Sequence, residues 1–266
     1  MELTGIMHCH SLYSYDAKMS LAEIKELCKK NGVQFVCMTE HTDELTHERA
    51  EAFVRECDAL SDETFLFIPG FEVPYGHTHI LMIGERTFSG TYAATIDMLK
   101  KWTSTAPFVV LAHPVRNAFQ VDDTLLEEID ALEVWNQQYE GKYVPRTRSL
   151  RLFDTLRLQK SSLVATGGID MHRAPHFGAP LITLNATILS ESDILEKLKI
   201  GAFRIHSERA SLYGVLPNAP ALIRLYWWQS MRSVVTIMLG KWVNALLAQL
   251  GLRAPKSLTQ FVRSRV

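Results

Sequence analysis

The chain has 266 residues, of which 47% are apolar, and this length suits one large α/β domain or two smaller ones with a sizeable core. The apolar content argues against a chain that is disordered over most of its length. The formal net charge of -1 conceals an asymmetry, because residues 207–266 carry eight Lys and Arg against Glu208 alone, so this segment is near +7 and the rest is near -8.

Short β-rich runs alternate with helical patterns from residue 3 to about residue 207, which is typical of βα units and predicts a mainly parallel sheet or a barrel. The clearest helix begins at Ser20, where Ser20 and Glu23 form a capping-box pattern, and it ends at Asn31-Gly32. Strands are expected at residues 3–8, 33–39, 65–73, 79–83, 108–112, 131–135, 163–166 and 181–184. Further helices are expected at residues 46–60, 92–102, 144–160 and 191–200.

The pattern changes after residue 207, and we expect a boundary there between a body (1–207) and a basic tail (208–266). Residues 222–250 have helical spacing, a wide apolar face and the adjacent Trp227 and Trp228. The simplest interpretation is a helical tail that packs against the body. Contact with a membrane surface or with a partner helix is the alternative, because Arg and Lys beside a Trp-bearing apolar face are typical of surface-bound helices.

The four cysteines, Cys9, Cys28, Cys37 and Cys57, form no Cys-x-x-Cys pair, which favours reduced, buried thiols and a cytoplasmic location. The first residues contain no basic and apolar leader, so we expect no cleaved signal peptide. The apolar stretch 222–250 is interrupted by Arg and Lys, so no transmembrane segment of about 20 residues is expected.

Clusters of His and acidic residues come directly after the expected strands. Because side chains alternate along a strand, His8 and His10 should point the same way and Cys9 the other way. In βα barrels the carboxyl ends of the strands assemble the active site, so these clusters should meet there. They comprise His8 and His10, Asp16, Glu40-His41, Glu72, His77 and His79, His113-Pro114, and Asp170 with His172.

Carboxylates and imidazoles are the ligands of hard and borderline divalent metals, and a carboxylate that bridges two ions places them about 3.5 to 4 Å apart. Any one histidine here could be a turn residue or a solvated side chain. The joint alignment of the clusters with strand ends is what predicts a multinuclear metal site.

The ordered motifs resemble those of the PHP (polymerase and histidinol phosphatase) family. They are His8-Cys9-His10-Ser11 with Ser14 and Asp16, Thr39-Glu40-His41, Gly70-Phe71-Glu72, His79, Ala112-His113-Pro114 and Gly168-Ile169-Asp170-Met171-His172. The resemblance covers about residues 3–207. It implies a distorted (β/α)7 TIM-like barrel, here with a C-terminal helical extension, and two or three divalent ions (Mn, Zn or Fe) that hydrolyse phosphoesters.

By the same resemblance, His8 and His10 would bind one ion that Asp170 completes, and Glu72 would bridge it to a second. His41, Asp16 and His172 would bind a further ion, and His79 and His113 would serve the remaining position. Two positions depart from the family pattern, Glu40 in place of Asp and Ile169 in place of a frequent Ser. His79 is preferred over His77 because it opens an apolar strand.

The implied reaction is attack of a metal-activated hydroxide on phosphorus. Arg116 and Arg173 would hold the substrate phosphate, although each could be an ordinary solvated charge. His176 would donate a proton to the leaving oxygen, or it is only a loop residue. The expected partner is a small phosphorylated metabolite, a nucleotide or a short oligonucleotide.

Several alternatives stay open. The enzyme could be a phosphomonoesterase resembling histidinol phosphatase or a phosphodiesterase, and the sequence does not separate the two. An amidohydrolase-like enzyme normally adds a Lys ligand at a strand end, and no such Lys is found. A metal-stabilised binding protein that its basic tail recruits to a protein or lipid partner is the alternative from another class.

Overall fold

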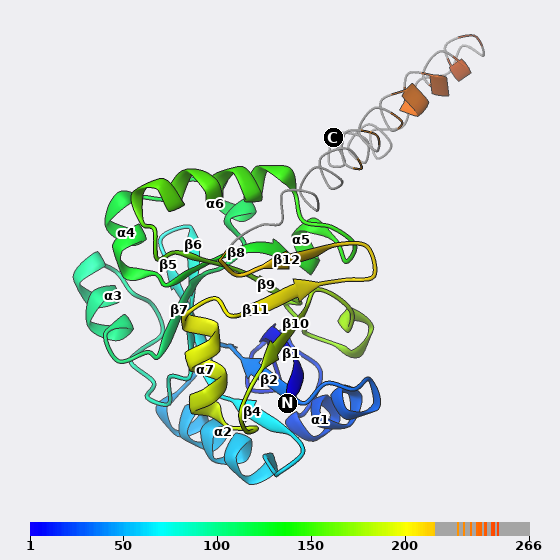
Figure 1. The fold of residues 1–266 in the computed structure, drawn as a ribbon. Coiled ribbons are helices and arrows are strands. Elements are labelled where there is room, and N and C mark those ends of the chain that lie inside the picture. Colours follow the sequence, from blue (N-terminus) through cyan, green and yellow to red (C-terminus); the bar gives the residue numbers. More distant parts are fainter. Residues whose placement is uncertain are drawn as a thin grey trace. The chain divides into compact units, whose positions relative to one another are not determined.

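The computed structural model describes residues 1–215 and, between residues 228 and 249, only the positions 228, 231, 235, 238–240, 242–243, 246–247 and 249. The chain divides into two compact units, Met1–Asn218 and Ala219–Val266. In the first unit the strands gather in the centre and helices lie around them (Figure 1). In the described part of the chain, no helix is both long and apolar enough to cross a membrane.

The strands of the first unit form two six-stranded sheets. The first sheet has the order β12-β11-β10-β1-β2-β4 and the second has the order β3-β5-β6-β7-β8-β9. The strands of the first sheet are β1 (Glu2–Cys9), β2 (Phe35–Met38), β4 (Leu66–Ile68), β10 (Leu181–Asn185), β11 (Phe203–His206) and β12 (Ser211–Tyr213). Those of the second are β3 (Glu40–His41), β5 (Gly70–Tyr75), β6 (Thr78–Ile83), β7 (Phe108–Leu111), β8 (Ala131–Asn136) and β9 (Val164–Gly168).

The helices are α1 (Leu21–Lys30), α2 (His47–Leu60), α3 (Ile96–Thr103), α4 (Asp123–Glu128), α5 (Gln137–Glu140), α6 (Thr147–Gln159) and α7 (Glu191–Lys199). The capping box of α1 is present, because Glu23 N donates to Ser20 Oγ and Ser20 N donates to Glu23 Oε2. The helix expected from residue 92 begins only after the N-cap Thr95. The helix expected from residue 144 begins at Thr147, after Arg146 in the N-cap position.

The single strand expected at residues 65–73 is two strands, β4 and β5, and they belong to different sheets. Pro69 separates them, and proline has no N–H to donate to a ladder. The backbone at Gly70 is also crowded, since an added Cβ would lie 2.6 Å from the Met82 carbonyl oxygen. The sequence patterns also missed the short elements β3, β11, β12, α4 and α5.

Both sheets are mixed rather than mainly parallel. In the second sheet β6 runs antiparallel to β5 and to β7. β5 and β6 form a hairpin whose turn is Gly76-His77, with Gly76 at φ 57°, a conformation that glycine adopts without strain. In the first sheet β10 is antiparallel to β1 and to β11. A mixed α/β fold is therefore shown.

The second sheet meets strands of the first sheet at both of its own edges, β3 and β9. β2 passes into β3 through Thr39, and β4 passes into β5 through Pro69. On the opposite side, Cys9 at the end of β1 forms a parallel bridge with Met171, beyond the end of β9. Among the described strands, however, the hydrogen-bonded ladders do not run around a closed ring.

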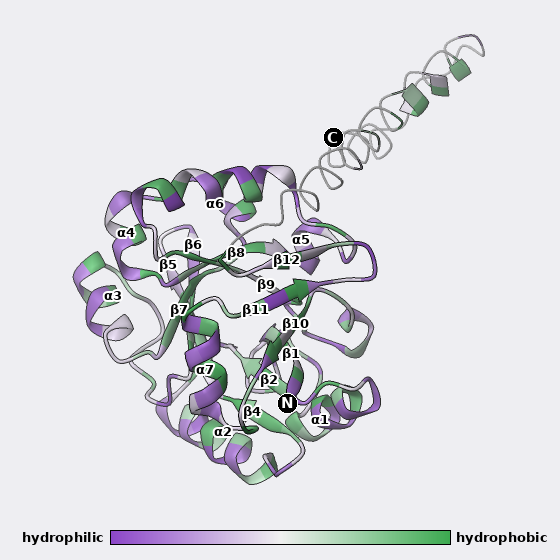
Figure 2. Cartoon of the chain, in the orientation of Figure 1, coloured by the Kyte–Doolittle hydropathy of each residue, from purple (hydrophilic) through white to green (hydrophobic). Residues whose placement is uncertain are grey.

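The apolar core lies between the strands and the inner faces of the helices, and the strands are the most hydrophobic part of the fold (Figure 2). α1, for example, buries Leu21, Ile24 and Cys28 and exposes its charged residues. All four cysteines are buried and unbonded. This packing holds the ends of the strands in place, and those ends carry the candidate site.

Candidate metal centre

The nine predicted ligand residues converge from separate elements on one pocket of about 760 Å³. His8 and His10 lie beneath its floor and are fully buried. The other seven line the pocket: Asp16, His41, Glu72, His79, His113, Asp170 and His172. The convergence arises because β1, β3, β7 and β9 end at the same side of the fold.

Glu72 lies at the centre of this cluster and is itself buried. Its Oε2 lies 3.2 Å from His8 Nε2, 3.2 Å from His10 Nε2 and 3.2 Å from His41 Nδ1. Its Oε1 lies 2.5 Å from His79 Nδ1 and 3.0 Å from His113 Nε2. One carboxylate therefore contacts five imidazoles, two through one oxygen and three through the other.

Asp170 joins the two histidines of the first motif. Its Oδ1 lies 3.6 Å from His8 Nε2 and 3.5 Å from His10 Nε2. Simple strand alternation does not produce this arrangement, because the β1–β2 register shifts between Met7 and Cys9 and His8 has φ 61°. The bulge at His8 still leaves its ring beside that of His10, with centroids 5.2 Å apart.

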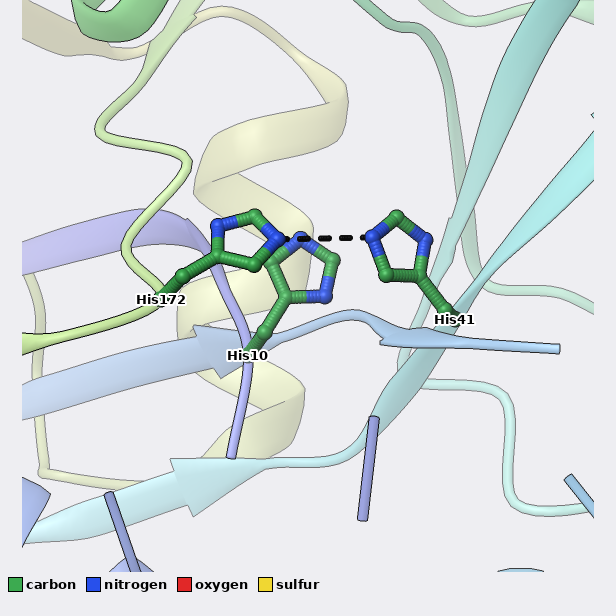
Figure 3. A group of neighbouring side chains, drawn as sticks. All are labelled: His10, His41 and His172. Atoms are coloured by element: carbon green, nitrogen blue, oxygen red, sulfur yellow. Dashed lines mark hydrogen bonds between the residues drawn. The ribbon is translucent and has the colours of Figure 1, made fainter. Parts of the chain in front are cut away.

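A second group forms where His10, His41 and His172 face one another (Figure 3). The His10 ring stacks on both others, with centroids 4.3 Å apart in each case. His172 Nε2 lies 3.4 Å from His41 Nε2 and 3.2 Å from Asp16 Oδ2. The structure thus brings together His41, His172 and Asp16, as the resemblance implied.

His79 lies in the cluster and His77 does not. His77 is exposed in the β5–β6 turn, whereas His79 is near the start of β6 and directs Nδ1 to Glu72. The expectation that every cluster follows the end of a strand is wrong for His79. It reaches the site because β6 is antiparallel, so its amino end lies at the same edge as the carboxyl ends of its neighbours.

The donor set fits divalent metal ions. His10 Nε2, His41 Nδ1 and His113 Nδ1 are buried and make no aligned hydrogen bond, although the first two lie 3.2 Å from Glu72 Oε2. Buried polar atoms rarely lack a partner, so such atoms call for an explanation. Among the described residues, His, Asp and Glu side chains form four groups of three, and within each group the ligand atoms lie within 4.8 Å of one another. Imidazole and carboxylate ligands suit divalent metal ions.

Hydrogen bonds outside the cluster orient the histidines as metal ligands are usually oriented. His8 Nδ1 lies 3.0 Å from Glu133 Oε1, and His172 Nδ1 lies 3.0 Å from the Asp170 carbonyl oxygen. A ring that donates from Nδ1 keeps the Nε2 lone pair for an ion. In both rings that Nε2 atom faces the cluster.

Glu133, in the middle of β8, is the residue that the sequence reasoning missed. Besides His8, it accepts hydrogen bonds from His113 N at 2.7 Å and from Asn136 Nδ2 at 3.0 Å. In the sequence, Glu133 lies inside the apolar strand expected at residues 131–135. A buried acid between apolar neighbours is unfavourable unless it is paired, and this was the available signal.

Glu40 faces away from the cluster and holds the loop after β1. Its Oε1 accepts hydrogen bonds from Ser11 N at 2.9 Å and Ser11 Oγ at 2.6 Å, and its Oε2 accepts one from Ser14 Oγ at 2.5 Å. Ser14 Oγ in turn accepts a hydrogen bond from His41 N. Glu40 therefore fixes the loop after β1, and the hydrogen bonds of its carboxylate go to Ser11 and Ser14 of that loop.

In the described part of the chain, five residues other than glycine have positive φ, and three of them are predicted ligands: His8, His113 and Asp170. Such conformations are unfavourable for residues with a side chain and concentrate at functional sites. The surrounding sheet therefore holds these side chains toward the pocket against a local backbone preference.

The acids and histidines of the cluster shift one another's pKa. Burial opposes the charged form of His10, yet hydrogen bonds with Asp170 and Glu72 raise its pKa to about 9. Burial and the charge on His10 lower the pKa of His41 to about 3. Burial opposes the charge on Glu72, but the charge on His8 and hydrogen bonds with His10 hold its pKa well below the usual value. The carboxylate is thus kept ionised.

Cationic and aromatic side chains surround the mouth of the pocket. Arg116 Nη1 lies 3.4 Å from His79 Nε2, and the Arg116 guanidinium lies 5.9 Å from the Tyr139 ring centroid. Arg173 Nε donates to His176 Nε2 at 2.6 Å. Lys18 and Tyr15 also line the pocket, and the sequence reasoning named neither.

Burial and the charge on Arg173 lower the pKa of His176, so its ring is neutral near pH 7. A neutral ring that accepts from Arg173 through Nε2 has no proton on that atom. For His176 to donate a proton from Nε2, the contact with Arg173 would have to break.

The fold and the site define the class of protein: a mixed α/β protein with a buried group of His and carboxylate side chains that could hold metal. The PHP domain family matches residues 7–144, which is more than half of the chain, and the protein belongs to that family.

One curated relative is the DNA polymerase/3'-5' exonuclease PolX of Bacillus subtilis (strain 168), which is 34% identical over 106 residues. The match covers 37% of this chain and 18% of PolX, so the chain corresponds to a small part of that protein.

Solved structures share the fold at low sequence identity. A two-domain protein from Bacteroides vulgatus, described as containing a predicted PHP-like metal-dependent phosphoesterase, is 14% identical with a TM-score of 0.60, over 79% of this chain and 66% of that one. The lesion-specific endonuclease PfuEndoQ of Pyrococcus furiosus is 16% identical with a TM-score of 0.54, over 77% and 58%. PsfC of Pseudomonas syringae PB-5123 is 17% identical with a TM-score of 0.52, over 86% and 99%.

Proposed function

We propose that this protein is a metal-dependent phosphoesterase that hydrolyses a small phosphorylated metabolite, a nucleotide or a short oligonucleotide. The observation that carries the proposal is the buried Glu72 carboxylate in contact with five imidazoles. A carboxylate in this position can bridge ions, and multinuclear sites of this kind suit displacement at phosphorus. A pocket of about 760 Å³ is within the range of small-molecule sites.

We further propose that the two sheets form the distorted (β/α)7 barrel of the family. Three connections between the sheets support this barrel: the β2–β3 continuation, the β4–β5 continuation and the Cys9–Met171 bridge. Residues 208–266 would follow it as a helical extension. Within that range, however, β12 pairs with β11 and so belongs to the first unit.

The residues would hold two or three divalent ions, of Mn, Zn or Fe, in the groups that the structure assembles. His8, His10 and Asp170 would hold the first, with Glu72 shared between the first and its neighbour. His41, His172 and Asp16 would hold a second, and His79 and His113 would complete the remaining position. Bound divalent ions lower the pKa of water and offset phosphate charge, which is the chemistry that they supply here.

The chain's own residues would position the substrate. Arg116, close to His79 and stacked near Tyr139, would place its guanidinium against phosphoryl oxygens at the cluster. Arg173 also lines the pocket and would do the same, with its Nε held by His176. Glu133 would keep His8 Nε2 and the His113 backbone directed at the centre. A role for His176 as proton donor remains a proposal that requires Arg173 to move.

The activities named for two relatives support the proposal that nucleotides and oligonucleotides are candidate substrates. PolX is a 3'-5' exonuclease and PfuEndoQ is an endonuclease, and both act on phosphodiesters. A pocket of about 760 Å³ would also hold a phosphomonoester, so a phosphatase resembling histidinol phosphatase is the alternative.

The test is metal analysis of the purified protein together with hydrolysis assays in the presence of Mn²⁺. A phosphomonoester, a phosphodiester and a short oligonucleotide should be compared. His10→Ala and Asp170→Asn should abolish hydrolysis while the chain still folds, because His10 Nε2 and Asp170 Oδ1 belong to the buried cluster around Glu72 that would hold the ions. His77→Ala is the matched control, since this exposed turn histidine should be dispensable. Unchanged turnover in either ligand variant would refute the assignment.

A further inference from the structure

The last part of the chain combines positive charge with the absence of any acidic residue. After Glu208 the sequence contains no Asp or Glu, and it contains eight Lys and Arg between Arg209 and Arg265. At the same time the segment is rich in large apolar residues, including Trp227, Trp228 and Trp242. A segment of this composition needs an apolar environment and an anionic partner together.

The described residues of the second unit are helical and expose large apolar side chains. Apart from Trp228 at 38%, their exposed fractions range from 43% for Met231 to 66% for Trp242. The others are Val235, Met238, Leu239 and Leu246. The intervals between positions 231, 235, 238, 242 and 246 are three or four residues, which is the spacing of one face of a helix. This set of six residues is called the apolar stripe.

We propose that the apolar stripe binds an anionic membrane surface. Its Met, Leu and Val side chains would enter the boundary between head groups and acyl chains, and Trp242 would lie at the level of the head groups, where tryptophan is enriched. Lys and Arg of the same segment would contact anionic head groups, each adding an attraction that salt weakens. The catalytic unit would thereby be held at a lipid surface.

A second copy of the chain fits this surface less well. Paired helices normally set their partner by opposite charges beside the apolar seam, and this segment offers only positive ones. Two copies would bring like charges together. Nucleic acid would satisfy the positive charge, but phosphate groups would leave the apolar stripe exposed to water. A lipid surface satisfies both features.

The experiment measures binding of the full chain to vesicles of phosphatidylcholine alone and of phosphatidylcholine with about one third phosphatidylglycerol. We expect clear binding to the anionic vesicles, weak binding to the neutral ones, and loss of binding at high salt. Met238→Ser combined with Trp242→Ser should weaken binding about tenfold or more, because these are the most exposed members of the stripe. Arg232→Glu combined with Lys241→Glu should remove the preference for anionic vesicles.

Leu158→Ser combined with Ile188→Ser is the matched control, since both residues are exposed apolar side chains of the first unit. This variant should bind vesicles as the wild type does. The proposal is overturned if the full chain does not bind anionic vesicles, or if the stripe variant binds as well as the wild type. It is also overturned if the stripe variant instead loses self-association, DNA binding or thermal stability of the first unit. These measurements do not involve phosphoester hydrolysis.

Discussion

Glu133→Gln should weaken metal binding even though Glu133 is not itself a proposed ligand. Its carboxylate faces three donors: His8 Nδ1 at 3.0 Å, His113 N at 2.7 Å and Asn136 Nδ2 at 3.0 Å. A glutamine keeps the size but presents an NH₂ group to at least one of these donors. The hydrogen bond lost there is charge-assisted, and such bonds contribute roughly 1.5 to 3 kcal/mol.

The expected loss of metal affinity is about 10- to 100-fold, which is what removal of a ligand's hydrogen-bond partner typically causes. The assay is calorimetric titration with Mn²⁺ or Zn²⁺ after treatment with a chelator. Glu85→Gln is the matched control, because Glu85 is also buried and accepts from Arg86 N, Thr87 N and Thr105 Oγ1, outside the site. The reasoning is refuted if Glu133→Gln binds metal like the wild type, or if Glu85→Gln loses as much affinity.

Two further predictions concern Gly168 and Glu140. Gly168→Ala should lower the melting temperature and weaken metal binding more than about tenfold, because an added Cβ would lie 2.1 Å from Glu133 Oε1 and 2.6 Å from the His8 Cβ; normal metal affinity in this variant would contradict the packing. Glu140→Gln should stabilise the protein at pH 8 but change little at pH 4.5. Burial raises the pKa of Glu140 to about 8, so the folded state holds a proton that the unfolded state releases above about pH 4.5. The stability of the wild type should therefore fall by up to about 1.4 kcal/mol per pH unit between these values, and unfolding by urea at several pH values checks it. The same pH dependence in the variant would show that another group is responsible.

Most of the proposed ligands could be predicted from the sequence because each lies next to a short apolar run that indicates a strand. His8, His41, His113 and Asp170 each follow or end a short apolar run, so a strand-end position could be read without the fold. His79 is preferred over His77 for a different local reason, because an apolar run begins directly after it. The structure places these residues together, and their role as ligands stays a proposal.

Glu133 and the direction of β6 could not be read in this way. An acid in an apolar strand looks like an interruption until its partners, His8 and His113, are known to lie across the site. The antiparallel hairpin of β5 and β6 is fixed by pairing between strands, which a strand pattern does not reveal. The division of residues 65–73 between two sheets likewise depends on which neighbours each half meets.

The sequence by itself determined the alternation of strands and helices, the capping of α1, and the supply of imidazoles and carboxylates, because these depend on neighbours within a few residues. Only the tertiary structure decided that Glu72 contacts five histidines, that Glu133 supports His8, and that Gly168 must lack a side chain to admit the Glu133 carboxylate. These features join residues separated by as many as 125 positions in the chain. The physical reason is that close packing and burial set such contacts, and both exist only once the sheets have come together.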